Sequence, residues 1–205
     1  MTWSDFLTLL IDNINNTSWL EIVAVFFGIL SVWYAKKANI LVYTTGIISV
    51  LIYVYICFFA GLYADMGING VYFIMSVYGW ILWSGKKQSN KTRPITFCNL
   101  KFHFLNILVL IFFFVVLSFI LKSYTDSTVP IWDSITTSLF IVGMLLMALK
   151  KTENWIFWII GDVISIPLYF SKGLIFTSLQ YTVFLILAIL GFIQWLRIYN
   201  KENTN

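Results

Sequence analysis

Long runs without a charged residue constrain this chain more than any other feature of its sequence. No charged residue lies between Lys37 and Asp65, Asp65 and Lys86, Lys101 and Lys122, or Lys172 and Arg197. A helix that crosses a bilayer needs about 20 mostly apolar residues. These runs, together with three shorter ones, predict seven transmembrane spans at residues 18–36, 39–60, 67–86, 102–122, 131–150, 154–172 and 174–198. The runs are too long for β-barrel strands of about 10 residues, so we expect an all-α integral membrane protein.

The composition supports the same fold class. Of the 205 residues, 60% are hydrophobic and only 11% are charged, against about 45–50% and about 25% in average soluble domains. So few charges cannot cover the surface of a soluble domain of this size. The composition therefore excludes a disordered chain, a secreted disulfide scaffold and an ordinary cytosolic enzyme. Residues 1–16 have two acidic residues and no basic ones, and we expect an interfacial amphipathic helix there rather than a cleaved signal peptide.

The basic residues fall mainly on one side of the seven-span arrangement. Eleven of the 13 lysines and arginines lie on that side, and only Lys122 and Lys172 lie on the other. By the positive-inside rule the first side is cytoplasmic, which places the N-terminus outside and the C-terminus in the cytoplasm. The net charge of +4 is then explained by topology, and we expect no nucleic-acid partner.

The first three and the last three spans resemble each other. At a shift of 115 residues, Gly28, Asn39 and Gly46 align with Gly143, Asn154 and Gly161; after a three-residue gap the shift becomes 112, and Gly61, Gly79 and Trp83 align with Gly173, Gly191 and Trp195. This pattern predicts two three-helix repeats, at 17–88 and 129–198, joined by a loop and linker helix at 89–128 and followed by a cytoplasmic tail at 199–205. With one span between them, the two repeats have the same orientation in the membrane, and transporters of this kind bind substrate between their repeats.

Polar and aromatic residues recur at helical spacing on four of the predicted spans, which places each set on one helix face. We take the following as candidate substrate-binding residues: Asn39, Tyr43, Tyr72, Ser76, Trp80, Asn154, Trp155, Trp158, Asp162, Tyr169 and Gln180. Competing structural roles exist for several of them. Tryptophan and tyrosine also anchor helices at membrane interfaces, and the two asparagines follow basic clusters, where they could cap helices.

Asp162 is the candidate that is hardest to explain structurally. It lies eight residues into its predicted span, and a carboxylate at that depth costs about 2.5–3.5 kcal/mol on insertion scales. It therefore needs a partner, water or a ligand, although a hydrogen bond to a neighbouring helix would serve as well. His103 is the only histidine, and no metalloprotease, serine hydrolase or phosphate-loop motif is present. We expect no catalytic residues, metal or cofactor.

Two motifs resemble a known family. Glu153-Asn154-Trp155-x-x-Trp158 opens the sixth span, and Tyr78-Gly79-Trp80-x-x-Trp83 closes the third; both are similar to motifs of the Pnu-type bacterial vitamin transporters, over about residues 19–195. The resemblance implies a three-one-three arrangement like that of the SWEET sugar transporters, a homotrimer, and facilitated diffusion followed by phosphorylation inside the cell. It also implies that Trp155 and Trp158 bind substrate. Asp162 departs from the family, whose riboside transporters carry asparagine there.

Members of that family take up nicotinamide riboside or thiamine, and both solutes are monocations. We hypothesise a uniporter for nicotinamide riboside, with Trp155, Trp158 and Tyr43 packed on the substrate. The same-class alternative is a transporter for thiamine or another ring-bearing vitamin. Two other classes stay open: a membrane receptor or scaffold that binds without translocating, and an intramembrane enzyme that changes its ligand chemically.

Overall fold

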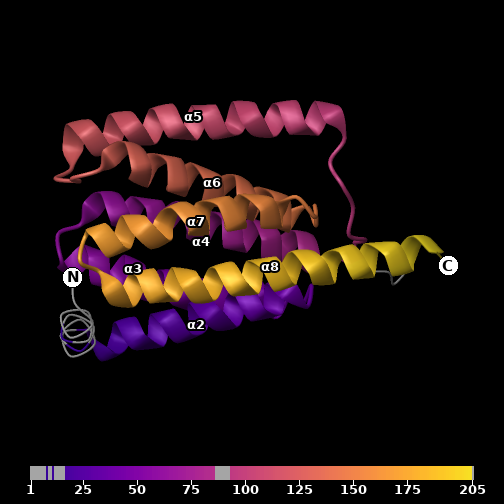
Figure 1. Ribbon diagram of the computed structural model, residues 1–205, viewed down its shortest axis with the longest axis horizontal. Coiled ribbons are helices and arrows are strands. Elements are labelled where there is room, and N and C mark those ends of the chain that lie inside the picture. The colour runs from indigo at the N-terminus through magenta and orange to yellow at the C-terminus, as the bar shows by residue number, and fades with distance from the viewer. Residues whose placement is uncertain (1–7, 9–10, 12–16, 86–92, 205) are drawn as a thin grey trace.

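The computed structural model describes residue 8, residue 11, residues 17–85 and residues 93–204, and the predicted interfacial segment 1–16 lies almost entirely outside them. The described ranges contain seven helices that are long and apolar enough to cross a membrane (Figure 1). They are α2 (Trp19–Lys36), α3 (Leu41–Phe59), α4 (Tyr63–Ser84), α5 (Leu100–Tyr124), α6 (Pro130–Ala148), α7 (Asn154–Ser171) and α8 (Ile175–Thr204). The predicted all-α membrane fold with seven spans is confirmed.

Local signals set where these helices begin and end. The side chains of Ser18 and Asn99 accept hydrogen bonds from the first turns of α2 and α5, and Pro130 opens α6, where its missing N–H costs nothing. Helix α4 begins at Tyr63, four residues earlier than predicted, because the chain turns sharply at Gly61 and re-enters a helix directly. Helix α8 continues beyond the predicted span to Thr204.

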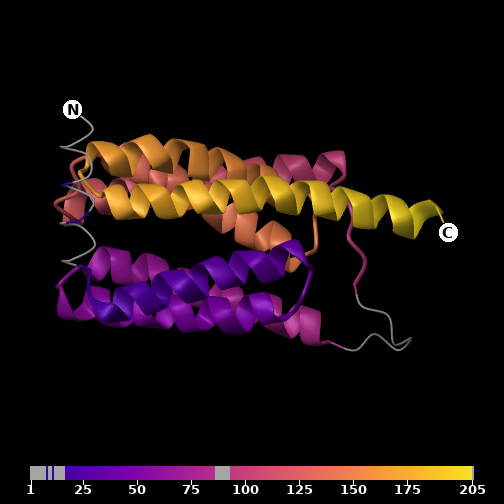
Figure 2. The same ribbon diagram turned by 60° about the horizontal axis from the view of Figure 1, so that its bottom comes forward.

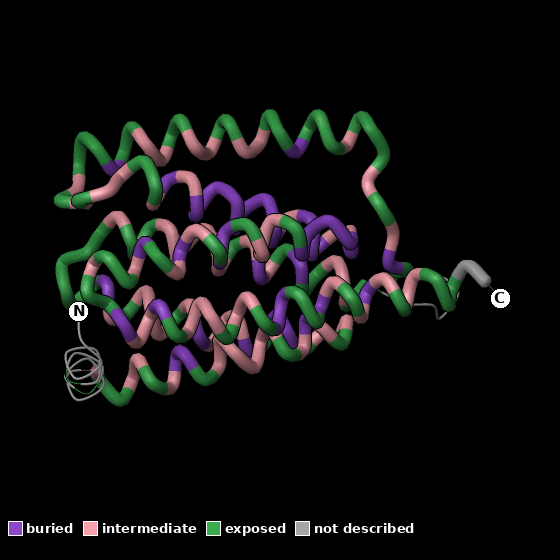
Figure 3. The backbone as a smooth tube through the Cα atoms, in the orientation of Figure 1, coloured by how far each residue is buried: buried purple, intermediate pink, exposed green. Residues whose placement is uncertain are grey.

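The helices form two groups of three that close into a ring. Helix α3 packs between α2 and α4, and α7 packs between α6 and α8; the groups meet where α2 contacts α8 and α4 contacts α6. Figure 2 shows the two groups as separate layers. Helix α5 lies outside the ring against α6, so α6 is buried along most of its length while α5 exposes apolar side chains (Figure 3).

Four turns show how the two groups correspond. The α2–α3 and α6–α7 turns each contain a residue with positive φ, Ala38 (49°) and Lys150 (53°), and the α3–α4 and α7–α8 turns contain Gly61 (72°) and Gly173 (75°). In all four, the next residue donates its N–H to a carbonyl five positions earlier, as in a Schellman cap. Both pairs are 112 positions apart.

This constant spacing corrects the 115-residue shift predicted for the first two spans of each repeat. That shift aligned glycines that have different neighbours in the structure. A Cβ on Gly28 would face Ser49, whereas a Cβ on Gly143, the glycine that this shift aligns with it, would press on Trp158. The glycines make room for different side chains and do not occupy equivalent positions. The two-repeat division itself, including its boundaries, stays a prediction that the matched turns support.

We call the end of the bundle that holds the α2–α3 and α6–α7 turns the basic end, because Lys36, Lys37, Lys150 and Lys151 lie there.

Candidate functional site

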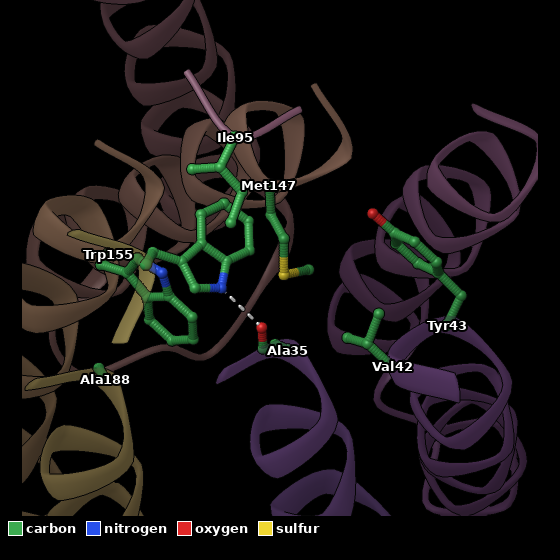
Figure 4. Close-up of a cluster of buried hydrophobic side chains, with 8 residues drawn as sticks. Ala35, Val42, Tyr43, Ile95, Met147, Trp155 and Ala188 are labelled. Carbon is green, nitrogen blue, oxygen red and sulfur yellow. Dashed lines mark hydrogen bonds between the residues drawn. The ribbon is translucent and has the colours of Figure 1, made fainter. Parts of the chain in front are cut away.

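Four aromatic side chains from four helices meet toward the basic end. Tyr43 of α3 packs edge-on against Trp83 of α4, with ring centroids 5.1 Å apart, and Trp155 of α7 packs edge-on against Trp195 of α8 at 5.6 Å. Trp83 and Trp195 then join the two pairs at 6.4 Å. Tyr43, Trp155 and Trp195 are each no more than 2% exposed. Figure 4 shows buried side chains of this region, with Val42 and Tyr43 at the right, Trp155 and Ala188 at the left, and Ala35, Met147 and Ile95 between them.

Two glycines and two hydrogen bonds fix this arrangement. A Cβ on Gly79 would overlap the ring of Tyr43, and a Cβ on Gly191 would overlap the ring of Trp155, so only glycine lets these rings lie so close to α4 and α8. The Nε1–H of Trp195 donates to the carbonyl of Ala35 (2.9 Å), and that of Trp83 donates to the carbonyl of Ala148 (3.0 Å). Each bond joins one helix group to the other, so the cluster ties both groups together.

Several buried polar atoms, at the cluster and deeper along α7, have no hydrogen-bond partner among the described residues. Four of them belong to α7: Asn154 Oδ1, Trp155 Nε1, Asp162 Oδ1 and Ser165 Oγ; the hydroxyl of Tyr43 is a fifth, across the bundle on α3. At least about 90% of buried polar groups in proteins are paired, so such a concentration on one helix face needs an explanation. A bound polar ligand provides one.

A column of stacked rings continues from this face toward the opposite end. Trp158 stacks on Phe140 of α6 (5.2 Å), Phe140 on Tyr181 of α8 (6.0 Å), and Tyr181 on Tyr169 of α7 (5.0 Å), with interplanar angles of 24°, 10° and 13°. Asp162 lies between Trp158 and Tyr169 on the same helix and interacts electrostatically with Tyr181. The arrangement therefore offers flat aromatic faces beside a carboxyl group.

The structure brings most of the predicted site residues together and separates two of them. Tyr43, Asn154 and Trp155 are buried at the cluster, Asp162 is buried about two turns further along α7, and Trp158 and Tyr169 belong to the ring column. Ser76 is buried near Gly46, Tyr72 interacts with Tyr169 and Tyr181, and Gln180 interacts with Tyr53.

Asn39 and Trp80 are the two residues that lie elsewhere. Asn39 is exposed, and its Oδ1 accepts from the N–H of Leu41 (3.0 Å), two positions on; the N-cap of α3 is Ile40, so the capping role considered for Asn39 is not the one it has. Trp80 is 45% exposed on the outside of the bundle.

Two residues of the ring column are absent from the predicted site. Phe140 and Tyr181 were not among the polar and aromatic residues recognised at helical spacing, because a Phe or Tyr on an apolar helix usually packs against other apolar side chains or faces lipid. The sequence carries one signal nonetheless: Phe140 lies three positions before Gly143, one of the glycines aligned between the repeats, and residues three apart share a helix face.

The chain resembles known membrane proteins over nearly its whole length. The model of the nicotinamide mononucleotide transporter family matches residues 18–197. The nicotinamide riboside transporter PnuC of Escherichia coli (strain K12) is 29% identical, covering 87% of this chain and 85% of its own, and that of Neisseria mucosa is 28% identical, covering 92% and 76%. The riboflavin/roseoflavin transporter RibM of Streptomyces davaonensis is 21% identical, covering 86% and 84%.

One solved structure shares the fold. It is the crystal structure of the vitamin B3 transporter PnuC, which superposes with a TM-score of 0.71 at 25% identity and covers 96% of this chain and 88% of its own.

Proposed function

The chain belongs to the nicotinamide mononucleotide transporter family, and from this premise we propose that it carries nicotinamide riboside across the bacterial inner membrane. A membrane transporter, and not an enzyme, is what the family and the PnuC relatives establish. The identity of the substrate is the part that we propose. It is supported by what the relatives transport and by the residues that face the centre of the bundle.

The observation that carries this proposal is the row of unpaired buried polar atoms on α7, flanked by aromatic rings. Nicotinamide riboside has a flat cationic ring, an amide and a hydroxylated ribose. The ring would stack against Trp155 or Trp158, and Asn154, Ser165 and Tyr43 would supply hydrogen bonds to the amide and the hydroxyls. Both kinds of contact are available on one helix face.

The charges argue for the riboside over the mononucleotide. A phosphate would require a cationic partner. The buried Lys150 lies at the basic end, with Nζ 4.5 Å from the Trp83 ring centroid, and no lysine or arginine of the described chain interacts with Asp162. The carboxyl group deepest in the candidate site is that of Asp162, which is 1% exposed. A doubly negative phosphate beside it would be strongly disfavoured.

The energetics permit transport without a coupled ion. One positive charge gains about 2.3 kcal/mol per 100 mV of membrane potential, which corresponds to roughly 50-fold accumulation. We propose uniport with alternating access between the two helix groups, trapping of the product by phosphorylation, the N-terminus outside with the basic end in the cytoplasm, and a homotrimeric assembly, as the family resemblance implies.

Uptake of radiolabelled nicotinamide riboside into liposomes that contain the purified protein tests the proposal. We expect saturable uptake that rises with an inside-negative potential. Thiamine and riboflavin, supplied in parallel, test the other substrates of this class, and saturable uptake of either without the riboside would overturn the substrate assignment. Binding without flux would instead indicate a receptor. Trp155→Ala should abolish uptake, whereas Trp80→Ala, the same change on the outer surface, should leave it intact.

A further inference from the structure

Asp162 is buried without a positively charged neighbour. Its side chain is 1% exposed in the middle of α7, and Oδ1 has no hydrogen-bond partner among the described residues. No lysine, arginine or histidine of the described chain interacts with it. The neighbouring groups that face it are aromatic or neutral: Trp158 and Ser165 on its own helix, and Tyr181 on α8.

A carboxylate in such surroundings costs free energy, because its charge has lost its hydrating water and no cation or hydrogen-bond donor replaces it. Structural carboxylates in membrane spans normally pair with a cation or with backbone groups. The Asp133–Lys172 pair at the far end of this bundle, with Nζ and Oδ1 2.8 Å apart, is a carboxylate of this protein that does have a cationic partner. The missing partner at Asp162 is therefore informative.

We propose that Asp162 receives its counter-charge from the substrate, so that the site selects its ligand by the positive charge of the ring and not only by shape. This inference rests on the proposed function and makes it more specific. A ring of the same shape without the charge would leave Asp162 unpaired. Trp158 ends the column of stacked rings, so one of its faces is not covered by another ring of the column, and such a face attracts cations.

Two ligands that differ in charge but hardly in shape allow a direct test. Nicotinamide riboside is cationic, and its reduced dihydropyridine form is neutral. Binding of both would be measured by competition with the wild-type protein and with Asp162→Asn, which keeps the side-chain shape. We expect the wild type to prefer the cation at least tenfold. Asp162→Asn should lower that preference at least tenfold, through weaker binding of the cation, while binding of the neutral form changes less than threefold.

The control is Asp65→Asn, which removes an exposed acidic residue of α4 and should leave the preference unchanged. Retained binding of the neutral form shows that the Asp162→Asn protein is folded. Equal binding of the cationic and the neutral ligand by the wild type would overturn the proposal, and this measurement needs no variant. An unchanged preference for the cation in Asp162→Asn would also overturn it. Absence of riboside uptake by the wild type would instead refute the proposed function.

A second inference comes from a separate part of the molecule, residues 93–99, which cross the basic end between α4 and α5. We call them the crossing segment. Thr96 forms a parallel bridge with the α6–α7 turn: its N–H donates to the carbonyl of Lys150, and the N–H of Thr152 donates to its carbonyl, both at 3.0 Å. The N–H of Cys98 donates to Oε1 of Glu153 (2.7 Å).

The crossing segment also closes the aromatic cluster from the basic end. Ile95 is 3% exposed and packs in the same buried cluster as Trp155, Trp195 and Met147 (Figure 4). Trp155, a member of the same cluster, follows the Glu153 anchor by two positions. The segment is thus attached to the turn that carries the first residues of the candidate site.

We infer that the crossing segment is the barrier at this end, and that it must separate from the α6–α7 turn for substrate to pass. The directly bridged pair Thr96→Cys and Lys151→Cys, in a background with Cys57 and Cys98 replaced by serine, should form a disulfide, because bridged residues lie within disulfide range. Oxidation should reduce riboside uptake at least tenfold and reduction should restore it, while the single-cysteine variants are unaffected by either treatment.

Unchanged uptake by the fully cross-linked protein would overturn this inference. Alkylation of Ile95→Cys provides a second measurement that does not depend on the disulfide. Turnover of the riboside should accelerate its reaction with a maleimide at least threefold if the segment moves, and an unchanged rate during turnover would contradict the barrier role.

Discussion

Removing the hydroxyl of Tyr43 should stabilise the empty protein and weaken its binding of substrate. The ring is 2% exposed, and its hydroxyl has no partner among the described residues. A buried polar group without a hydrogen bond costs about 1–3 kcal/mol. Tyr43→Phe removes that cost and keeps the edge-on contact with Trp83. At about 2–4 °C per kcal/mol for a chain of this size, we expect a melting temperature about 2–12 °C higher without ligand.

The same change should reduce the stabilisation that nicotinamide riboside provides. If the hydroxyl bonds to the substrate, its loss costs about 1 kcal/mol of binding, which is about fivefold in affinity. Thermal unfolding in detergent, with and without saturating riboside, measures both quantities. Tyr55→Phe is the control, because Tyr55 lies on the same helix but is 54% exposed. A Tyr43→Phe protein that is less stable when empty, with an unchanged response to riboside, would refute the reasoning.

Three further predictions concern packing, an ion pair and a thiol. Gly191→Ala should destabilise the protein by about 1–3 kcal/mol and abolish uptake, because the added Cβ would overlap the Trp155 ring. Gly70→Ala is the control, because its added Cβ meets no other atom, and it should be neutral or slightly stabilising in thermal unfolding. Equal losses of stability in the two variants would contradict this account. Lys172→Met should cost about 1 kcal/mol at low salt and less at high salt, since it breaks the 2.8 Å pair with Asp133; a loss that does not depend on salt would exclude the ion pair as its cause. Burial, with the charge of Glu153, raises the pKa of Cys98 to about 11, so little of its thiol is ionised at pH 8. Alkylation of Cys98 at pH 8 should therefore be far slower in the folded protein than in the unfolded protein, and the folded protein should react faster toward pH 11. Equal alkylation rates of the folded and unfolded protein at pH 8 would contradict the raised pKa.

Much of the fold could be predicted from the sequence because a bilayer leaves few alternatives. Backbone groups in lipid must be satisfied within the segment, so a long uncharged run has to be a helix, and all seven predicted spans are helices here. The neighbours of each helix could not be predicted in this way. Lipid and protein interiors are equally apolar, so an exposed face such as that of α5 looks like a buried one in the sequence.

The candidate site was predictable where polarity marked it and not where only packing did. Asn154, Trp155 and Asp162 follow one face of α7 and are all buried. Trp80 was grouped with Tyr72 and Ser76 by steps of four residues, but each such step advances the helix by about 40° beyond a full turn. Two steps rotate Trp80 out of the bundle, and Gly79 and Trp83 occupy the inner face instead.

The contact between the first and last helices of the ring has a consequence for biosynthesis. Trp195 donates to the carbonyl of Ala35 across 160 positions of sequence, so α2 enters the membrane long before its partner on α8 exists. At about 5–20 residues per second, the ribosome needs about 8–30 s to make the intervening chain. During that time the inner face of α2 must be sheltered by lipid or by the insertion machinery. A ribosome stall or a premature stop before α8 would leave that face open and mark the fragment for proteolysis.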